Sequence, residues 1–180
     1  RFNKGDPTPQ SYLNELKFYE GLIKQHRVEL LALSEIESEQ VAIEFARQLG
    51  ANWRVAFRQG RDTATGQDVA ILTSLGEPEL VTDFGFPSGE VDGHKPKRLS
   101  KVVGLVINID GRRVGVITSH FLSKRNESPR KSAKRLMQAK AIVKAHDSLE
   151  DLGAAILLGD FKQLFLFNYH SIFYLFSFFK

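Results

Sequence analysis

Residues 154–161 read AAILLGDF, a short apolar run that ends in Gly-Asp. A continuous aliphatic run of strand length is typical of a parallel strand that is covered on both faces. Because α/β proteins place ligands at the carboxyl ends of such strands, the pattern predicts that Asp160 lies at a binding edge. Gly-Asp after a strand is also a common turn, so this second interpretation stays open for Asp160 taken alone.

The residues before this strand alternate between helical and strand patterns, which predicts an α/β (α+β) fold. Helices are expected from Thr8, after Ser38 and after Ser128, where Ser-Pro is a favourable helix start. Strands are expected at residues 28–33, 53–57, 69–73, 80–84 and 154–158. Alternating aliphatic residues on both sides of Asp110-Gly111 predict two further strands joined as a tight hairpin.

The helix expected after Ser128 is strongly basic. Its predicted apolar stripe consists of Ala133, Leu136, Ala139 and Val143. A neighbouring face presents Lys131, Arg135 and Gln138. That face would either bind phosphate or be solvated, and the solvated interpretation is favoured because charged helix faces usually meet water.

The composition limits the possible classes of site. The 180 residues are 42% hydrophobic and 26% charged, as in one ordinary globular domain. With no cysteine, thiolate metal sites and cysteine nucleophiles are excluded, so any metal must be held by carboxylate, amide, histidine or water. The net charge of +4 permits an anionic partner without requiring one.

Three polar residues follow apolar strands: Glu35 after LLALS, His120 after VGVITS and Asp160 after AILLG. Each one alone has a structural explanation: Glu35 could cap the following turn, His120 could be a hydrogen-bonded histidine at a strand end, and Asp160 could belong to a Gly-Asp turn. If the strands are parallel neighbours, however, their carboxyl ends meet at one edge of the sheet. The sequence therefore predicts that these three side chains form one site.

These segments resemble the endonuclease/exonuclease/phosphatase superfamily of deoxyribonuclease-like, metal-dependent phosphodiesterases. The resemblance covers most of residues 8–161, through LLALSEIES (30–38), GQDVAILTS (66–74), the hairpin and following loop (98–124), RLMQAKAI (135–142) and AAILLGDF. It implies a hydrolase of phosphate esters. The implied fold is a four-layered two-sheet sandwich, of which this chain supplies a part.

The resemblance also implies roles for individual residues. Glu35 would hold Mg²⁺ or Mn²⁺, His120 would donate a hydrogen bond to the scissile phosphate, and Asp160 would position the attacking water or the metal. Substrate contacts are expected from Arg98, Lys124, Arg125 and Arg135. For Arg98 and Arg135 the alternative is a role in supporting the fold, and that alternative is favoured. The basic run after His120 favours nucleic acid over phospholipid or inositol phosphate as the substrate, and the chain is expected to be a monomer.

The sequence departs from the family pattern in three places. Asn3 comes too late to be the family's N-terminal asparagine, and Lys162 stands where a second asparagine is expected. The family's late Asp-His pair has no counterpart, since His170 has no adjacent aspartate. Because a lost general base costs about 10²- to 10⁴-fold in rate, the chain alone is expected to be inactive or weakly active. The alternative is a non-catalytic relative that binds phosphorylated ligands or a protein partner.

Residues 162–180 differ in composition from the rest of the chain. They contain six phenylalanines, against eight in residues 1–161. We therefore expect an incomplete domain over residues 1–161, followed by a tail that comes from an altered reading frame or splice. The apolar run in the tail is shorter than the roughly 18 to 20 residues that a membrane span needs, so no span is expected.

Overall fold

The computed structural model describes residues 9–60, 66–81, 89–91, 94–97, 101–150, 152 and 154–161. Its helices are α1 (Pro9–Gln25), α2 (Glu39–Leu49) and α3 (Pro129–Glu150). Its strands are β1 (Leu30–Ile36), β2 (Arg54–Arg58), β3 (Asp68–Thr73), β4 (Glu79–Val81), β5 (Gly89–Val91), β6 (His94–Lys97), β7 (Val102–Ile109), β8 (Arg112–His120) and β9 (Ala155–Asp160).

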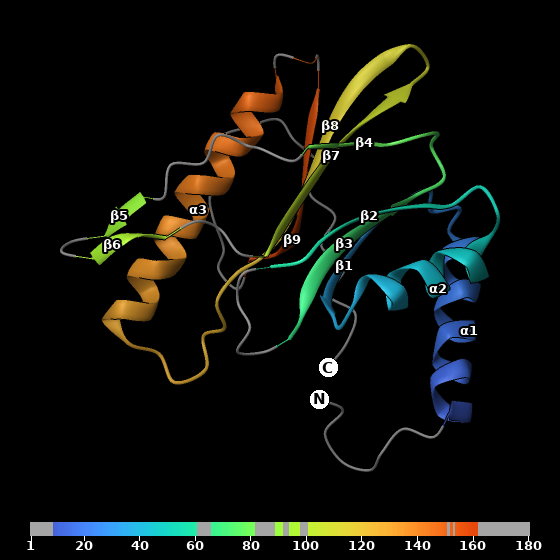
Figure 1. Ribbon diagram of the computed structural model, residues 1–180, viewed down its shortest axis with the longest axis horizontal. Coiled ribbons are helices and arrows are strands. Elements are labelled where there is room, and N and C mark those ends of the chain that lie inside the picture. The colour runs from blue at the N-terminus through green and yellow to red at the C-terminus, as the bar shows by residue number, and fades with distance from the viewer. Residues whose placement is uncertain are drawn as a thin grey trace.

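Two sheets pack against each other, with helices on both outer faces (Figure 1). One sheet has the strand order β1-β3-β2 and the other β4-β7-β8-β9. Helices α1 and α2 cover the first sheet, and α3 covers the second. The α+β fold and the four-layered two-sheet architecture are therefore confirmed.

The core between the sheets follows the period of two that strands impose. Val69 and Ile71 of β3 meet Val103 and Leu105 of β7 in one buried cluster, joined by Val116 of β8. These five side chains are fully buried. Burial of aliphatic surface at about 25 cal/mol per Å² makes this layer a main source of stability.

The hairpin between β7 and β8 is confirmed. Asp110 has φ +51° and Gly111 has φ +79°, so both residues of the loop take left-handed conformations. Two such residues match the right-handed twist of the flanking strands, which pair from Ile109 with Arg112 onward. This local signal fixes the register of the central strands, and with it the position of His120 at the end of β8.

The strand at AAILLGD is parallel, as its apolar run predicts. β9 pairs with β8 in register, from Gly115 with Ala155 to His120 with Asp160. The crossover between them contains α3, which packs closely on β8. A Cβ atom on Gly115 would lie 2.8 Å from Leu149 Cβ, so a side chain at this position would push the helix away.

The predicted stripe on α3 was wrong in part. Leu136 is 52% exposed. The buried side chains of this helix are Arg135, Met137, Ala139, Ile142, Ala145, His146 and Leu149. Because Arg135 and His146 occupy positions on the inward face, a search for apolar residues alone shifts that face around the helix.

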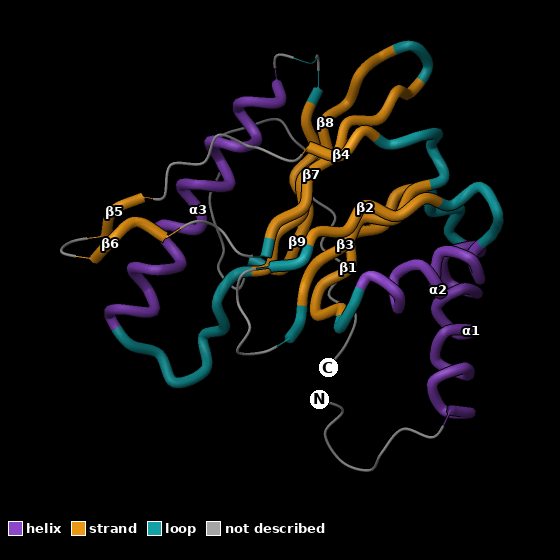
Figure 2. The backbone as a smooth tube through the Cα atoms, in the orientation of Figure 1, coloured by secondary structure: helices purple, strands orange, loops and turns teal. Residues whose placement is uncertain are grey.

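Other strand predictions were close to the structure or fall outside it. The strand expected at 28–33 begins at Leu30 instead and runs on to Ile36. The short β5–β6 pair beside α3 was not predicted (Figure 2). Arg98 and residues 162–180 lie outside the described residues. Across the described part of the chain, no helix is both long and apolar enough to cross a bilayer.

Candidate active site

The three predicted site residues come together at one end of the sandwich. His120 and Asp160 are the last residues of β8 and β9 and are paired in the ladder. The Nε2 atom of His120 lies 3.9 Å from Asp160 Oδ2 and 3.8 Å from Glu35 Oε1. These distances are too long for hydrogen bonds but short enough for ion pairs when the imidazole is protonated.

The route by which Glu35 reaches this site differs from the prediction. Parallel neighbours bring together His120 and Asp160, but β1 belongs to the other sheet and is antiparallel to its neighbour β3. β1 contacts both β8 and β9 across the sandwich. The site therefore spans the two sheets, and its geometry depends on how they pack.

A bulge in β1 turns Glu35 toward His120. Ser34 pairs with Val69 and Ile36 pairs with Asp68, so Glu35 is an extra residue in the ladder. The core under α1 and α2 contains Leu31, Leu33 and Ile36. Glu35 therefore does not take the inward position that strict alternation along the strand would give it. Its φ of +63° is uncommon for a non-glycine residue. Strained backbone of this kind occurs often at functional sites.

Asp160 is held by the glycine before it and by its own carbonyl. Gly159 has φ +140°, and a Cβ there would lie 2.1 Å from the carbonyl oxygen of Ser119. Only glycine allows β9 to approach β8 this closely. The backbone N–H of Phe121 donates to the Asp160 carbonyl over 2.9 Å. The Gly-Asp pair thus sets the position of the carboxylate, as well as ending the strand.

His120 is fixed from the other side of β8. Its backbone N–H donates to the Lys101 carbonyl over 3.1 Å, and the Ser119 hydroxyl donates to the same oxygen over 2.9 Å. The exposed side-chain fraction rises from 8% for His120 and 11% for Asp160 to 35% for Glu35. A ligand would therefore reach the carboxylate of Glu35 most easily.

The donor set suits a hydrated hard cation. Mg²⁺ and Mn²⁺ prefer carboxylate oxygens, and Mg²⁺ keeps several waters while one or two carboxylates hold it. The described residues contain no group of three or more His, Cys, Asp or Glu that could hold a metal. The Glu35 carboxylate, the most exposed of the three side chains, could hold such an ion only if water and phosphate oxygens completed its ligands.

The predicted substrate residues fall into two groups. Lys124 and Arg125 are exposed in the loop after β8, whereas Arg135 is only 3% exposed. The solvated-face interpretation was thus wrong for Arg135. Its Nη2 atom donates to Glu127 Oε2 over 2.6 Å, and this hydrogen bond lowers the pKa of the Glu127 carboxyl below its usual value. Glu127 was not predicted, because nothing in the sequence marks it as the partner of Arg135.

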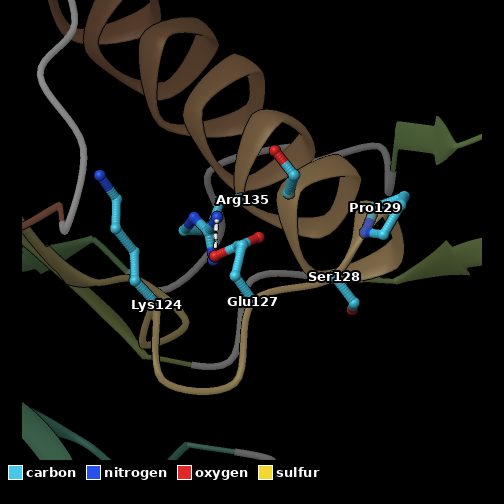
Figure 3. Close-up of a pocket in the computed structure, with 6 residues that line it drawn as sticks. Lys124, Glu127, Ser128, Pro129 and Arg135 are labelled. Atoms are coloured by element: carbon cyan, nitrogen blue, oxygen red, sulfur yellow. Dashed lines mark hydrogen bonds and ion pairs between the residues drawn. The ribbon is translucent and has the colours of Figure 1, made fainter.

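An open hollow of about 470 Å³ lies where this loop meets the start of α3 (Figure 3). It is lined by Lys124, Glu127, Ser128, Pro129, Ser132 and Arg135. Ser128 caps the helix, because its hydroxyl accepts from the Lys131 N–H over 3.3 Å. The hollow thus lies beside the segment that directly follows the His120 strand.

Comparison with known proteins gives a consistent result for the fold. No family model and no curated protein matches the sequence. Among solved structures, a humanized Danio rerio TDP2 matches with TM-score 0.57 and 13% identity, over 87% of this chain and 62% of that one. D. rerio TDP2 with a single-strand DNA product matches with TM-score 0.56 and 13% identity, over 84% and 55%.

Two further proteins match equally well. The human nocturnin catalytic domain with bound sulfate has TM-score 0.56 and 13% identity, over 83% of this chain and 57% of that one. ANGEL2, a 2′,3′-cyclic phosphatase, has TM-score 0.55 and 18% identity, over 85% and 44%. The chain thus spans 44% to 62% of the length of these structures. All belong to the endonuclease/exonuclease/phosphatase superfamily, and the described residues have the fold of that superfamily.

Proposed function

We propose that this chain contains the phosphate-binding part of a divalent-metal-dependent phosphodiesterase or nuclease, and that the chain alone is weakly active or inactive. The observation that supports this most is the approach of two carboxylates, from two different sheets, to the same imidazole nitrogen at 3.8 and 3.9 Å. An imidazole N–H can donate to a phosphoryl oxygen, and carboxylates can bind the cation that such chemistry uses.

In this proposal each side chain has one task. Glu35 holds Mg²⁺ or Mn²⁺ at the exposed side of the site, and the bound ion would polarise the phosphoryl oxygen. His120 donates a hydrogen bond to the phosphate from its buried position. Asp160 accepts a hydrogen bond from the attacking water and orients it, since the close β8–β9 pairing holds its carboxylate beside the imidazole.

A nucleic-acid strand is the substrate that we propose. The structurally similar D. rerio TDP2 was solved with a single-strand DNA product, and ANGEL2 was solved with adenosine-2′,3′-vanadate. In this chain, Lys124 and Arg125 are exposed in the loop after His120 and could contact neighbouring phosphates. Both observations favour a polynucleotide over a phospholipid or an inositol phosphate.

The proposal is tested by hydrolysis of bis(4-nitrophenyl) phosphate at high protein concentration with Mn²⁺. We expect any turnover to be slow, to require the metal and to fall about 10²-fold or more in His120→Gln, because a donor to the developing charge is lost. His26→Gln is the matched control, since His26 is exposed at the end of α1. Turnover that persists without Mn²⁺ or in His120→Gln contradicts the proposal. Binding of single-stranded DNA by a chain that neither turns over the ester nor binds Mn²⁺ supports the non-catalytic alternative.

A further inference from the structure

We propose that Arg135, with Gln138 and Lys131, acts as a positioning residue that holds residues 122–127 in one shape for binding a nucleic-acid strand beside His120. We call residues 122–127 the basic segment, and the three residues of α3 the clamp. This inference rests on the proposed function for its ligand. The clamp itself rests on contacts within the chain, and it can be tested separately.

The guanidinium of Arg135 holds the basic segment at two points. Nη2 donates to Glu127 Oε2 over 2.6 Å, and Nη1 donates to the Ser123 carbonyl over 3.5 Å. Figure 3 shows the first of these contacts as the dashed line between α3 and the loop. A planar guanidinium can reach two acceptors at once, so this single side chain links the beginning and the end of the segment.

The two other clamp residues bind the backbone of the segment at Leu122 and at Arg125. Gln138 Oε1 accepts from the Leu122 N–H over 3.0 Å, next to the end of β8. Lys131 Nζ donates to the Arg125 carbonyl over 2.5 Å, near the tip of the loop. Four of the six segment residues are therefore bonded to successive turns of one helix, although the segment has no regular secondary structure of its own.

Arg135 has a different task from Lys124 and Arg125, because it is buried and they are exposed. Arg135 is 3% exposed and is paired with the carboxylate of Glu127, which lies at the surface, so its charge is already matched within the chain. A guanidinium this buried has little surface left for a substrate phosphate, and its pair with Glu127 would have to break before a phosphate could take that place. Lys124 and Arg125 are exposed and lie on the loop that the clamp holds.

Fixing the loop before binding would strengthen the capture of a strand. A free loop with two long cationic side chains loses conformational entropy when it binds, and a loop that is already ordered loses less. The segment begins two residues after His120, so its shape sets where its cations lie relative to that imidazole. Loss of the clamp should therefore raise KM for an oligonucleotide and change kcat little.

The test uses limited trypsin digestion of the full chain, because Lys124 and Arg125 are themselves trypsin sites. Cleavage after them, followed by mass spectrometry, is expected to be about tenfold or more faster in Arg135→Met, since opening of the segment no longer breaks a charge-assisted hydrogen bond. Arg135→Lys should fall between, because an ammonium cannot bond both acceptors as the planar fork does. Lys134→Met, at an exposed neighbouring position, is the control and should match wild type.

Binding of a fluorescent single-stranded oligothymidylate, followed by anisotropy, gives the second readout. We expect Arg135→Met to weaken binding by about tenfold and Arg135→Lys to recover part of this loss. If Arg135→Met fails to fold, Gln138→Leu and Glu127→Gln test the same segment from its two ends. Each should speed cleavage after Lys124 and Arg125 relative to the control.

The possible failures can be told apart. Equal cleavage rates in folded clamp variants and wild type overturn the clamp. Faster cleavage with unchanged oligonucleotide affinity shows that the clamp serves the fold alone, which overturns the positioning role. If the clamp results are as expected but His120→Gln leaves metal-dependent hydrolysis intact, the proposed function fails and the clamp stands.

Discussion

Replacing Gly159 by alanine is expected to destabilise the fold by about 3 kcal/mol or more, the largest effect on stability that we predict. The new methyl group would lie 2.1 Å from the Ser119 carbonyl oxygen and 3.0 Å from the Ser119 nitrogen, both of which are backbone atoms. Neither can move without breaking the pairing of β8 with β9. The φ of +140° adds strain for any residue that has a Cβ.

Urea unfolding followed by circular dichroism measures this effect, with Gly66→Ala as the control. Gly66 also has a positive φ, +59°, but a Cβ there would meet nothing within 4 Å. Alanine at Gly66 should therefore lower the free energy of unfolding only by the cost of a left-handed backbone conformation, about 1 to 2 kcal/mol. Equal losses in the two variants would show that the approach of β9 to β8 is not as close as the structure has it.

Replacing Glu35 by glutamine is expected to have the largest effect on activity. Glutamine keeps the size of the side chain and a carbonyl oxygen but loses the charge that favours a divalent cation. Any Mn²⁺-dependent hydrolysis by the chain should fall by about 10²-fold or more, because the ion no longer neutralises charge at the phosphate. The φ of +63° is equally strained with glutamine, so the free energy of unfolding should change little.

Glu37→Gln is the matched control for this change. Glu37 lies two residues further along the chain and is exposed beyond the end of β1. It loses the same charge without being next to His120, so a general electrostatic effect would reduce the rates of both variants alike. A loss confined to Glu35→Gln assigns the metal requirement to that carboxylate. Equal loss in both variants counts against the proposed role of Glu35.

The elements that could be predicted are those whose signal is local. Asp110-Gly111 predicts its hairpin because positive φ at two adjacent residues depends on those residues alone. The apolar run before Gly159 likewise predicts a parallel strand, and the ladder of β8 with β9 confirms its direction. The expected cover on both faces is only partial, since β9 is the last strand in the order of its sheet and most of its residues are half-buried. These two features place His120 and Asp160 at one edge of a sheet.

The packing of two sheets could not be derived from periodicity. An alternating strand buries one face whether it meets a helix or a second sheet, so the partner of that face depends on long-range contacts. Only the resemblance to a known superfamily predicted the sandwich. For this reason the position of Glu35 was attributed to a parallel neighbour, whereas β1 reaches His120 from the opposite sheet.

One sign of this geometry lies in the burial pattern of β1. Leu31 and Leu33 keep the period of two, but the next buried apolar residue is Ile36, one position late. A skipped position between buried residues is what a bulge produces. On α3 the buried face could not be located from apolar residues alone. Two buried polar residues, Arg135 and His146, interrupt a face whose other residues are apolar and have helical spacing. The sequence does not show which polar residues become buried in the fold.

The most direct test of the account is binding of Mn²⁺ to the whole chain, titrated by electron paramagnetic resonance without any need for turnover. The account predicts that wild type binds Mn²⁺ at a site that is lost in Glu35→Gln and retained in Glu37→Gln. It also predicts that inorganic phosphate tightens this binding and that His120→Gln removes the phosphate effect. Unchanged Mn²⁺ binding in Glu35→Gln would contradict the claim that Glu35, beside His120 and Asp160, forms the metal side of a phosphoester site.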